Sequence, residues 1–498
     1  MTTAVKEIAV LSPQQQEKEA KQIGSDMQVG FSSFASLMLG VGSIIGSMAW
    51  LFHGPMIARA GTLASALAWI IAALCVLPLC LIIMELASMF PAAGGPYVYK
   101  YYALKRLAPG LGELFGFLTG WLFWIGWVVA LACMANGLVN MLSSSIWGSA
   151  NNSPLWFGPL IIATLFGVNT ICNFQSVNKS AIINNLFSLL KFAMAIAFMA
   201  LVFCSPSSSI SRVFQAASPS GSTDIVKNVL AVIMLALSGY GGLEMTGCTS
   251  SETKNAQKTV PLVMILTLAV VAIIYTSMSV SISAAAPYII DASKSTMIVA
   301  NTQVVATCPS IAGYLGGQIW GIVFTACVVA SIVGCGFGNL LGLSRVGYSM
   351  AKTGLFPAQF AQLDEQTKVP KYALIFQFWC LCIIGISANL LSRSGIFPDA
   401  YTFLAETFGV MYAFVAILYG VCALSLRYTD PVMPRPFRVG EQGNMLLWCL
   451  TIFTSAIWGY AAFGCTSSNN QLAALLILLA GVPIYSFYRW LPVKQTNT

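Results

Sequence analysis

The chain has few charged residues and a single histidine. Only 8% of its 498 residues are Asp, Glu, Lys or Arg, whereas 57% are hydrophobic. A soluble protein carries roughly 25% charged residues, so this composition excludes a water-soluble enzyme or binding module. The net charge of +8 comes with no dense basic cluster interleaved with aromatic side chains. Nucleic-acid binding is therefore a poor interpretation of it.

Patterns that carry catalysis or bind metal ions are also lacking. The 14 cysteines stand mostly singly within apolar runs, where a thiol packs as a small hydrophobic side chain. We therefore expect neither a disulfide framework nor a metal site. The sequence contains no Walker loop and no Ser/His/Asp set, so we expect no enzyme activity and no cofactor. His53 follows the first apolar run and is predicted to be an interfacial residue rather than a pH sensor.

Long apolar runs dominate what is present. Each is near or above the ~20 residues that a helix needs to cross a bilayer. The pattern predicts an all-α polytopic membrane protein with twelve transmembrane helices. The runs are approximately 30–58, 61–89, 111–142, 154–174, 182–204, 225–250, 260–287, 314–343, 372–392, 399–426, 444–465 and 470–490.

Basic residues predict the orientation of the chain. If the N-terminus is inside, eighteen of the 24 Lys and Arg residues fall on the inner side. Cytoplasmic segments are enriched in these residues, so both termini are expected in the cytoplasm. The chain then divides into a cytosolic tail (1–28), a membrane domain (29–490) and a second cytosolic tail (491–498). The inner connection 344–371 is predicted to be a short interfacial helix followed by a turn.

Glycine-rich breaks interrupt two of the apolar runs. They are Gly42–Ser47 in the first run and Ser238–Gly242 in the sixth. A break frees backbone N–H and C=O groups, which are costly in hydrocarbon unless they line a cavity or bind a ligand. Matched broken helices in the two halves of a chain are typical of a transporter binding site.

The positions of the breaks also predict an internal repeat. Runs one to five (about 30–204) can be laid over runs six to ten (about 225–427), with the last two helices (about 444–490) outside the repeat. An odd number of spans in each half gives the two halves opposite orientations. We therefore predict two inverted repeats of five helices each, with broken helices 1 and 6.

Several segments in this order resemble the amino acid–polyamine–organocation transporter superfamily, and the resemblance covers about residues 28 to 490. The superfamily has the five-plus-five inverted-repeat fold, also called the LeuT-like fold. The segments that carry the resemblance are Gly42–Ser47, Glu85–Tyr97, Gly241–Pro261, Ser344-Arg345 with Gly354–Pro357, and Arg435–Val439.

The resemblance implies a site for an amino acid zwitterion at the two breaks. Backbone N–H groups of the first break would hold the carboxylate; they belong to Gly46, Ser47 and Met48. Carbonyl groups beside both breaks would hold the ammonium; they belong to Ile44, Ser238 and Gly241. Alignment also places Trp127 and Asn339 beside the pocket, where Trp127 would shrink it or face an ammonium. The alternative is that the glycines only permit close helix packing.

Three ionisable residues are candidates for coupling. Lys191 lies deep within a span, and the resemblance implies that its charge replaces a sodium ion. The alternative for Lys191 is that it reaches the membrane surface. Glu244, just past the second break, would carry a proton or hydrogen-bond freed backbone. Glu406 would contact a proton or cation, or simply lie in an aqueous vestibule.

Together these features predict a sodium-independent amino acid transporter that works by alternating access. Coupling would be to protons or to exchange against another amino acid or amine. The alternatives are an amine or polyamine transporter of the same fold and a non-transporting amino acid sensor. We expect a multi-pass plasma-membrane protein, as in a bacterial inner membrane, with the lipid bilayer and the small-molecule substrate as partners. It would be a monomer or a homodimer.

Overall fold

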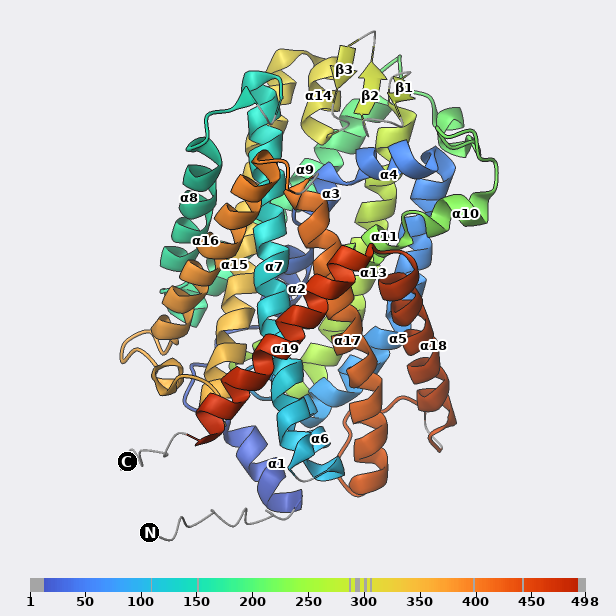
Figure 1. The fold of residues 1–498 in the computed structure, drawn as a ribbon. Helices are drawn as coiled ribbons and strands as arrows, with labels where there is room; N and C mark the ends of the chain where they lie inside the picture. Colours follow the sequence, from blue (N-terminus) through green and yellow to red (C-terminus); the bar gives the residue numbers. More distant parts are fainter. Residues whose placement is uncertain are drawn as a thin grey trace.

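The computed structural model forms one helical bundle in which the first described helix and the end of the last one lie on the same side. Both α1 (Pro13–Gln22) and the last turn of α19 (Ser468–Trp490) lie at the lower end in Figure 1, which we call the terminal end. The opposite end is called the far end. The predicted tail 491–498 and the first twelve residues lie outside the described residues. The structure describes residues 13–108, 110–149, 152–285, 288–291, 296–299, 302–304, 307–396, 399–440 and 443–490.

Among the described residues, nine helices are long and apolar enough to cross a membrane. The prediction of a multi-pass, largely helical membrane protein is thereby confirmed, while the total of twelve spans and the inverted repeat stay predictions. The nine helices are α5 (Thr62–Met89), α7 (Leu111–Trp147), α9 (Val177–Phe203), α13 (Ala256–Ala284), α15 (Gln318–Lys352), α16 (Lys371–Arg393), α17 (Ala400–Thr429), α18 (Met445–Gly464) and α19. A shorter apolar helix, α8, covers Phe157–Cys172.

The first and sixth predicted spans are each divided into short helices. The first consists of α2 (Ser33–Ile44), α3 (Ser47–Leu51) and α4 (His53–Ala60). The sixth consists of α10 (Ile225–Leu230), α11 (Ile233–Gly239) and α12 (Met245–Cys248), followed by the short η3 (Ser250–Glu252). Each span has one break where glycine interrupts the apolar run and a second break without glycine, at Phe52 in the first and at Ala231-Val232 in the sixth.

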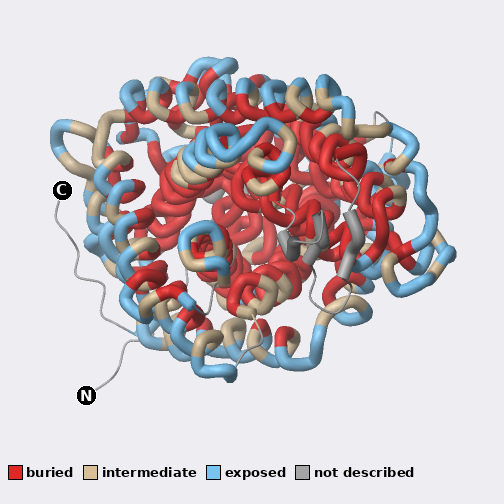
Figure 2. Tube along the Cα trace, turned by 90° about the horizontal axis from the view of Figure 1, so that it is seen from above, coloured by how far each residue is buried: buried red, intermediate tan, exposed pale blue. Residues whose placement is uncertain are grey.

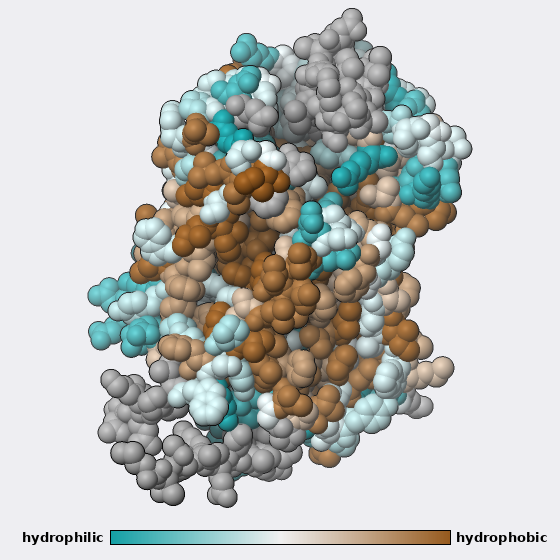
Figure 3. Space-filling view, in the orientation of Figure 1, coloured by the Kyte–Doolittle hydropathy of each residue, from teal (hydrophilic) through white to brown (hydrophobic). Residues whose placement is uncertain are grey.

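The broken helices lie inside a shell of continuous ones. Helix α5 packs along α13, α7 packs along α17, and α19 crosses both α7 and α17. Buried segments fill the interior and exposed segments form the rim when the bundle is seen from one end (Figure 2). Hydrophobic side chains cover the middle of the face in Figure 3, and hydrophilic ones gather toward its ends. This distribution fits a bundle whose middle is solvated by lipid.

Two buried ion pairs hold the terminal end together. Arg427 of α17 and Glu85 of α5 are 2.6 Å apart, and the side chains are at most 2% exposed. Arg345 of α15 and Glu252 of η3 form a second buried pair at 2.9 Å. Glu85 also accepts a hydrogen bond from the backbone N–H of Val439 at 2.8 Å. A buried pair persists only when such additional bonds satisfy both ions, so these contacts fix helix positions at this end.

The structure differs from the sequence prediction in two connections. Residues 344–352 are not a separate interfacial helix, because α15 continues without interruption to Lys352. The chain turns only at Gly354, whose φ of 77° is readily adopted by glycine. The short η4 (Ala358–Ala361) then leads to α16.

At the far end, part of the segment between the seventh and eighth predicted spans forms a small antiparallel sheet in the order β1-β2-β3. In its register Val299 of β2 is opposite both Tyr288 of β1 and Thr302 of β3. Among the described residues, this sheet departs from the predicted all-α fold. The remaining elements are α6 (Gly95–Leu107), η2 (Ile210–Phe214), β1 (Tyr288–Asp291), β2 (Thr296–Val299), β3 (Thr302–Val304) and α14 (Cys308–Gly316).

Candidate functional site: a cavity between two broken helices

The two helix breaks lie directly against each other. Gly242 adopts a φ of 116°, which side-chain-bearing residues rarely adopt. A Cβ atom at this position would lie 3.0 Å from Ile44 Cγ1 and 3.2 Å from the carbonyl oxygen of Ser43. Glycine at position 242 therefore allows both the turn of the second break and its close approach to the first.

Side chains from three surrounding helices satisfy the carbonyl groups that the first break frees. Lys191 Nζ of α9 donates to the carbonyl of Gly42 at 2.6 Å. Asn339 Nδ2 of α15 donates to the carbonyl of Ser43 at 2.8 Å, and Tyr275 Oη of α13 donates to the carbonyl of Ile44 at 2.9 Å. The break is therefore a fixed structure held from three sides, as a membrane interior requires.

The N–H groups just after the first break have no acceptor inside their own helix. Gly46 is the N-cap of α3, and Ser47 and Met48 are its first two residues. The first N–H groups of any helix cannot bond within it. Among the described backbone bonds outside helices, none uses the N–H of these three residues. They remain available to a ligand.

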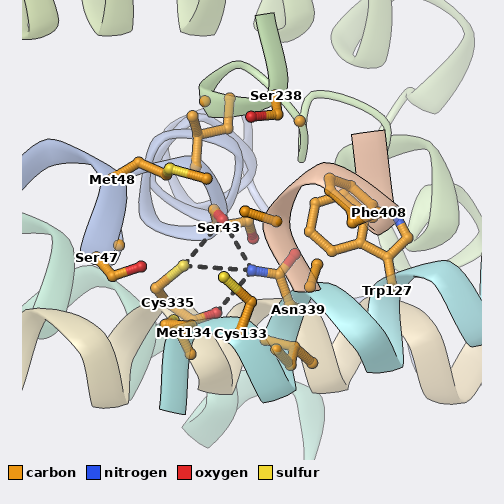
Figure 4. Close-up of a pocket in the computed structure, with 17 residues that line it drawn as sticks. Ser43, Ser47, Met48, Trp127, Cys133, Met134, Ser238, Cys335, Asn339 and Phe408 are labelled. Atoms are coloured by element: carbon orange, nitrogen blue, oxygen red, sulfur yellow. Dashed lines mark hydrogen bonds between the residues drawn. The ribbon is translucent and has the colours of Figure 1, made fainter. Parts of the chain in front are cut away.

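A cavity of about 60 Å³ lies between the breaks and helices α7, α15 and α17 (Figure 4). The structure places all eight residues of the predicted substrate site on its wall, and their role in binding stays a prediction. These residues are Ile44, Gly46, Ser47, Met48, Trp127, Ser238, Gly241 and Asn339. The carbonyl of Ile44 already accepts one bond from Tyr275, which leaves one of its two lone pairs free.

Sequence reasoning missed several other wall residues. Ser43 and Gly239 belong to the two breaks, and the others come from helices whose apolar sequence gives no sign of which face lines a cavity. Two thiols among them contact backbone: Cys335 donates to the carbonyl of Ser43 at 3.1 Å, and Cys133 to the carbonyl of Tyr401 at 3.2 Å. The missed residues are Ser43, Ala130, Leu131, Cys133, Met134, Gly239, Cys335, Ala405 and Phe408.

The three predicted coupling residues lie outside the cavity wall. Lys191 is 1% exposed and behind the first break, so it does not reach the membrane surface. Glu244 is fully buried at the start of α12 and accepts a hydrogen bond from Tyr412 Oη at 3.1 Å. Glu406 of α17 instead accepts from Asn470 of α19. Of the two carboxylates, Glu244 is the one next to a helix break.

His53 is not interfacial, contrary to the sequence prediction. It is fully buried, and its Nδ1 accepts a hydrogen bond from Trp69 Nε1 at 3.1 Å. Tyr275 and Tyr240 complete an aromatic cluster with Trp69, with ring centroids 4.6 Å and 6.0 Å from it. The hydrogen bond to Trp69 satisfies a polar nitrogen that would otherwise be costly to bury.

Lys100, one of the eighteen basic residues predicted on the inner side, is fully buried. It belongs to α6, a short helix at the terminal end and outside the membrane-spanning helices. Its Nζ lies 4.0 Å from the ring centroid of Tyr419, and no described residue accepts a hydrogen bond from it. Burial lowers the pKa of Lys100 to about 7, although nearby Cys422, Glu244 and Cys248 oppose the shift.

Fold and site together define a multi-pass membrane protein with a small cavity enclosed by two broken helices. A family model described as amino acid permease matches residues 31–483. The chain therefore belongs to the amino acid permease family, and the resemblance drawn from its motifs is confirmed. It is therefore a membrane permease for amino acid transport, and the relatives that it matches are transporters.

Three relatives illustrate the range of the family. The glutamate/serine transporter AimA of Bacillus subtilis (strain 168) is 27% identical, with 92% of this chain and 81% of the relative covered. The branched-chain amino acid permease BcaP of the same organism is 24% identical over 92% of each chain. The serine/threonine exchanger SteT of Bacillus subtilis (strain 168) is 25% identical over 90% of this chain and 94% of the relative.

The burial of Lys100 predicts a pH-dependent stability. Between pH 7 and the ordinary value of 10.5, the unfolded chain holds a proton on this lysine that the folded chain has lost. Stability therefore falls as pH is lowered through that window. We expect Lys100→Met to unfold at a higher temperature than wild type at pH 7, with the difference vanishing near pH 10.5. Thermal unfolding in detergent measures this.

Lys105→Met is the matched control, because Lys105 lies on the same helix but is only half-buried. It should change the melting temperature little at either pH. A Lys100→Met variant that is no more stable than wild type at pH 7, or equally more stable at both pH values, would contradict the assignment.

Proposed function

We propose that this protein is a sodium-independent secondary transporter of amino acids that works by alternating access around the described cavity. The observation that carries the proposal is the meeting of two broken helices at one small enclosed space. That arrangement offers backbone donors and acceptors inside a membrane, where continuous helices offer neither. Family membership and the relatives support amino acids as the substrate class.

The two charged groups of an amino acid fit opposite parts of this space. The carboxylate would accept from the N–H groups of Gly46, Ser47 and Met48, which lack acceptors within α3. The ammonium would donate to the carbonyls of Ile44, Ser238 and Gly241. The carbonyl of Ser238 accepts one bond, from the N–H of Gly241 at 3.1 Å, and retains a second lone pair.

Lys191 supports sodium independence. Its ammonium donates to the carbonyl of Gly42 behind the break, and Lys191 does not line the substrate cavity. A cation at this place balances the freed carbonyl groups of the first break. A permanently attached ammonium would do so without a bound sodium ion, and opening of the bundle would change its surroundings.

For coupling we propose protons or exchange against a second amino acid or amine. Glu244 supports proton coupling, because it is buried beside the second break with Tyr412 as its hydrogen-bond donor. A serine/threonine exchanger among the relatives supports exchange. Helices 1–5 and 6–10 would form the two inverted repeats of a twelve-span fold. We place both termini in the cytoplasm and the protein in a bacterial inner membrane.

Uptake by purified protein in liposomes tests the proposed function. We expect saturable uptake of radiolabelled alanine or serine that is unchanged when sodium is replaced by choline. Preloading with unlabelled amino acid, and separately an inward proton gradient, would distinguish exchange from proton coupling. Protein-free liposomes are the control. Uptake that requires sodium would overturn sodium independence, and the absence of saturable uptake of any amino acid would overturn transport itself.

Replacing Lys191 should stop transport without unfolding the protein. Losing a buried charged hydrogen bond removes about 1.5–3 kcal/mol, so transport by Lys191→Ala should fall at least about tenfold. Initial uptake rates, normalised to the amount of monodisperse protein, measure this. Lys179→Ala, at an exposed position of the same helix, should transport like wild type. Normal transport by Lys191→Ala would rule out its coupling role.

A further inference from the structure

The cavity between the breaks is too small for most amino acids. At about 60 Å³ it has less than half the ~150 Å³ of a cavity that holds a benzene ring, so a branched or aromatic side chain does not fit the space as it stands. A leucine or phenylalanine side chain would have to displace the wall.

The wall of the cavity also lacks charge. Among the described residues that line it, none is Asp, Glu, Lys, Arg or His. The nearby ionisable groups do not line the cavity: Lys191 donates to the carbonyl of Gly42, and Glu244 accepts from Tyr412 at one oxygen while its Oε1 has no described donor. A charged substrate side chain would therefore be desolvated without a partner, which is strongly unfavourable inside a membrane protein.

One side of the wall is made of rigid aromatic rings. Trp127 of α7 and Phe408 of α17 pack with ring centroids 5.2 Å apart, and both are at most 5% exposed. Phe123 lies behind Trp127 at 6.4 Å between centroids, which leaves the indole little room to turn. Met48 and Met134 form the other side, where thioether chains can adjust slightly (Figure 4). Trp127 and Phe408 therefore set the size limit.

Three polar side-chain atoms at the wall are buried without a described hydrogen-bond partner, and one of them is Trp127 Nε1. Asn339 Oδ1 is buried without a described hydrogen-bond donor, because only its Nδ2 is engaged with the carbonyl of Ser43. The hydroxyl of Ser43 is likewise buried without a described partner. An unpaired buried polar atom is unfavourable, so a ligand hydroxyl or thiol that donates to Asn339 would be favoured over an apolar group of equal size.

We propose that the site selects amino acids with small, uncharged side chains, such as alanine, serine and cysteine, and that Trp127 and Phe408 exclude larger ones. This inference rests on the proposed transport function and names its substrate class. In this proposal Asn339 Oδ1 accepts a hydrogen bond from the hydroxyl or thiol of the substrate side chain. Trp127 acts by limiting size, rather than by facing a substrate ammonium.

Competition against radiolabelled alanine uptake in liposomes tests the substrate class. Unlabelled serine and cysteine should inhibit uptake in the wild-type protein. Leucine, phenylalanine, glutamate and lysine should inhibit at least about tenfold more weakly, as expected when one or more side-chain groups do not fit. Inhibition by leucine or glutamate equal to that by serine would overturn the inference while leaving transport intact. Failure of saturable uptake for every amino acid would overturn the proposed function instead.

Trp127→Leu tests the size limit directly. The smaller side chain should let leucine inhibit alanine uptake at least about tenfold more strongly than in wild type. Trp121→Leu is the matched control on the same helix, because Trp121 does not line the cavity and donates instead to the carbonyl of Ile477. If Trp127→Leu does not fold, Phe408→Leu tests the same wall. A folded variant at either wall position with wild-type selectivity would contradict the assignment.

Discussion

The structure depends on one constraint: backbone groups freed inside a membrane must find partners. At the first break the carbonyls of Gly42, Ser43 and Ile44 lose their places in a continuous helix. Each then accepts from a side chain of a different helix, namely α9, α15 and α13. These bonds place the break at a fixed position among three scaffold helices. The N–H groups on its other side are left for a ligand.

The same requirement extends to charge in the interior. Lys191 is acceptable because a freed carbonyl receives its ammonium, and Arg427 because Glu85 faces it. Lys100 lacks such an acceptor among the described residues, and its pKa is lowered to about 7 as a result. Charge is thus concentrated at the terminal end and behind the first break. The described lining residues of the cavity include no Asp, Glu, Lys, Arg or His, which makes its size and the unpaired polar atoms of Ser43, Trp127 and Asn339 the main determinants of selection.

Much of the fold was predictable from residue order alone. Long apolar runs locate the helices, and glycine-rich interruptions locate both breaks, because each feature is local in the sequence. The eight predicted site residues lie at one cavity for the same reason, since five of them belong to the breaks and Met48 directly follows the first. Trp127 and Asn339 came from the family resemblance rather than from periodicity.

What remained hidden depends on contacts between distant segments. Nothing local in the sequence shows that Tyr275 bonds to Ile44, or that Phe408 packs on Trp127. The burial of Lys100 was not predicted, because an isolated lysine in a short polar helix normally faces water. The continuation of α15 to Lys352 was missed because its polar residues, including Ser349 and Arg345, are satisfied by buried hydrogen bonds.

The most direct test of the central claim is an experimental structure of the protein with an amino acid bound, with alanine as the ligand. We predict that alanine lies between the two breaks, with its carboxylate at the N–H groups of Gly46 and Ser47. Its methyl group should point toward Trp127. Alanine bound elsewhere, such as in the terminal-end pocket beside Glu19, Tyr101 and Lys352, would contradict the account.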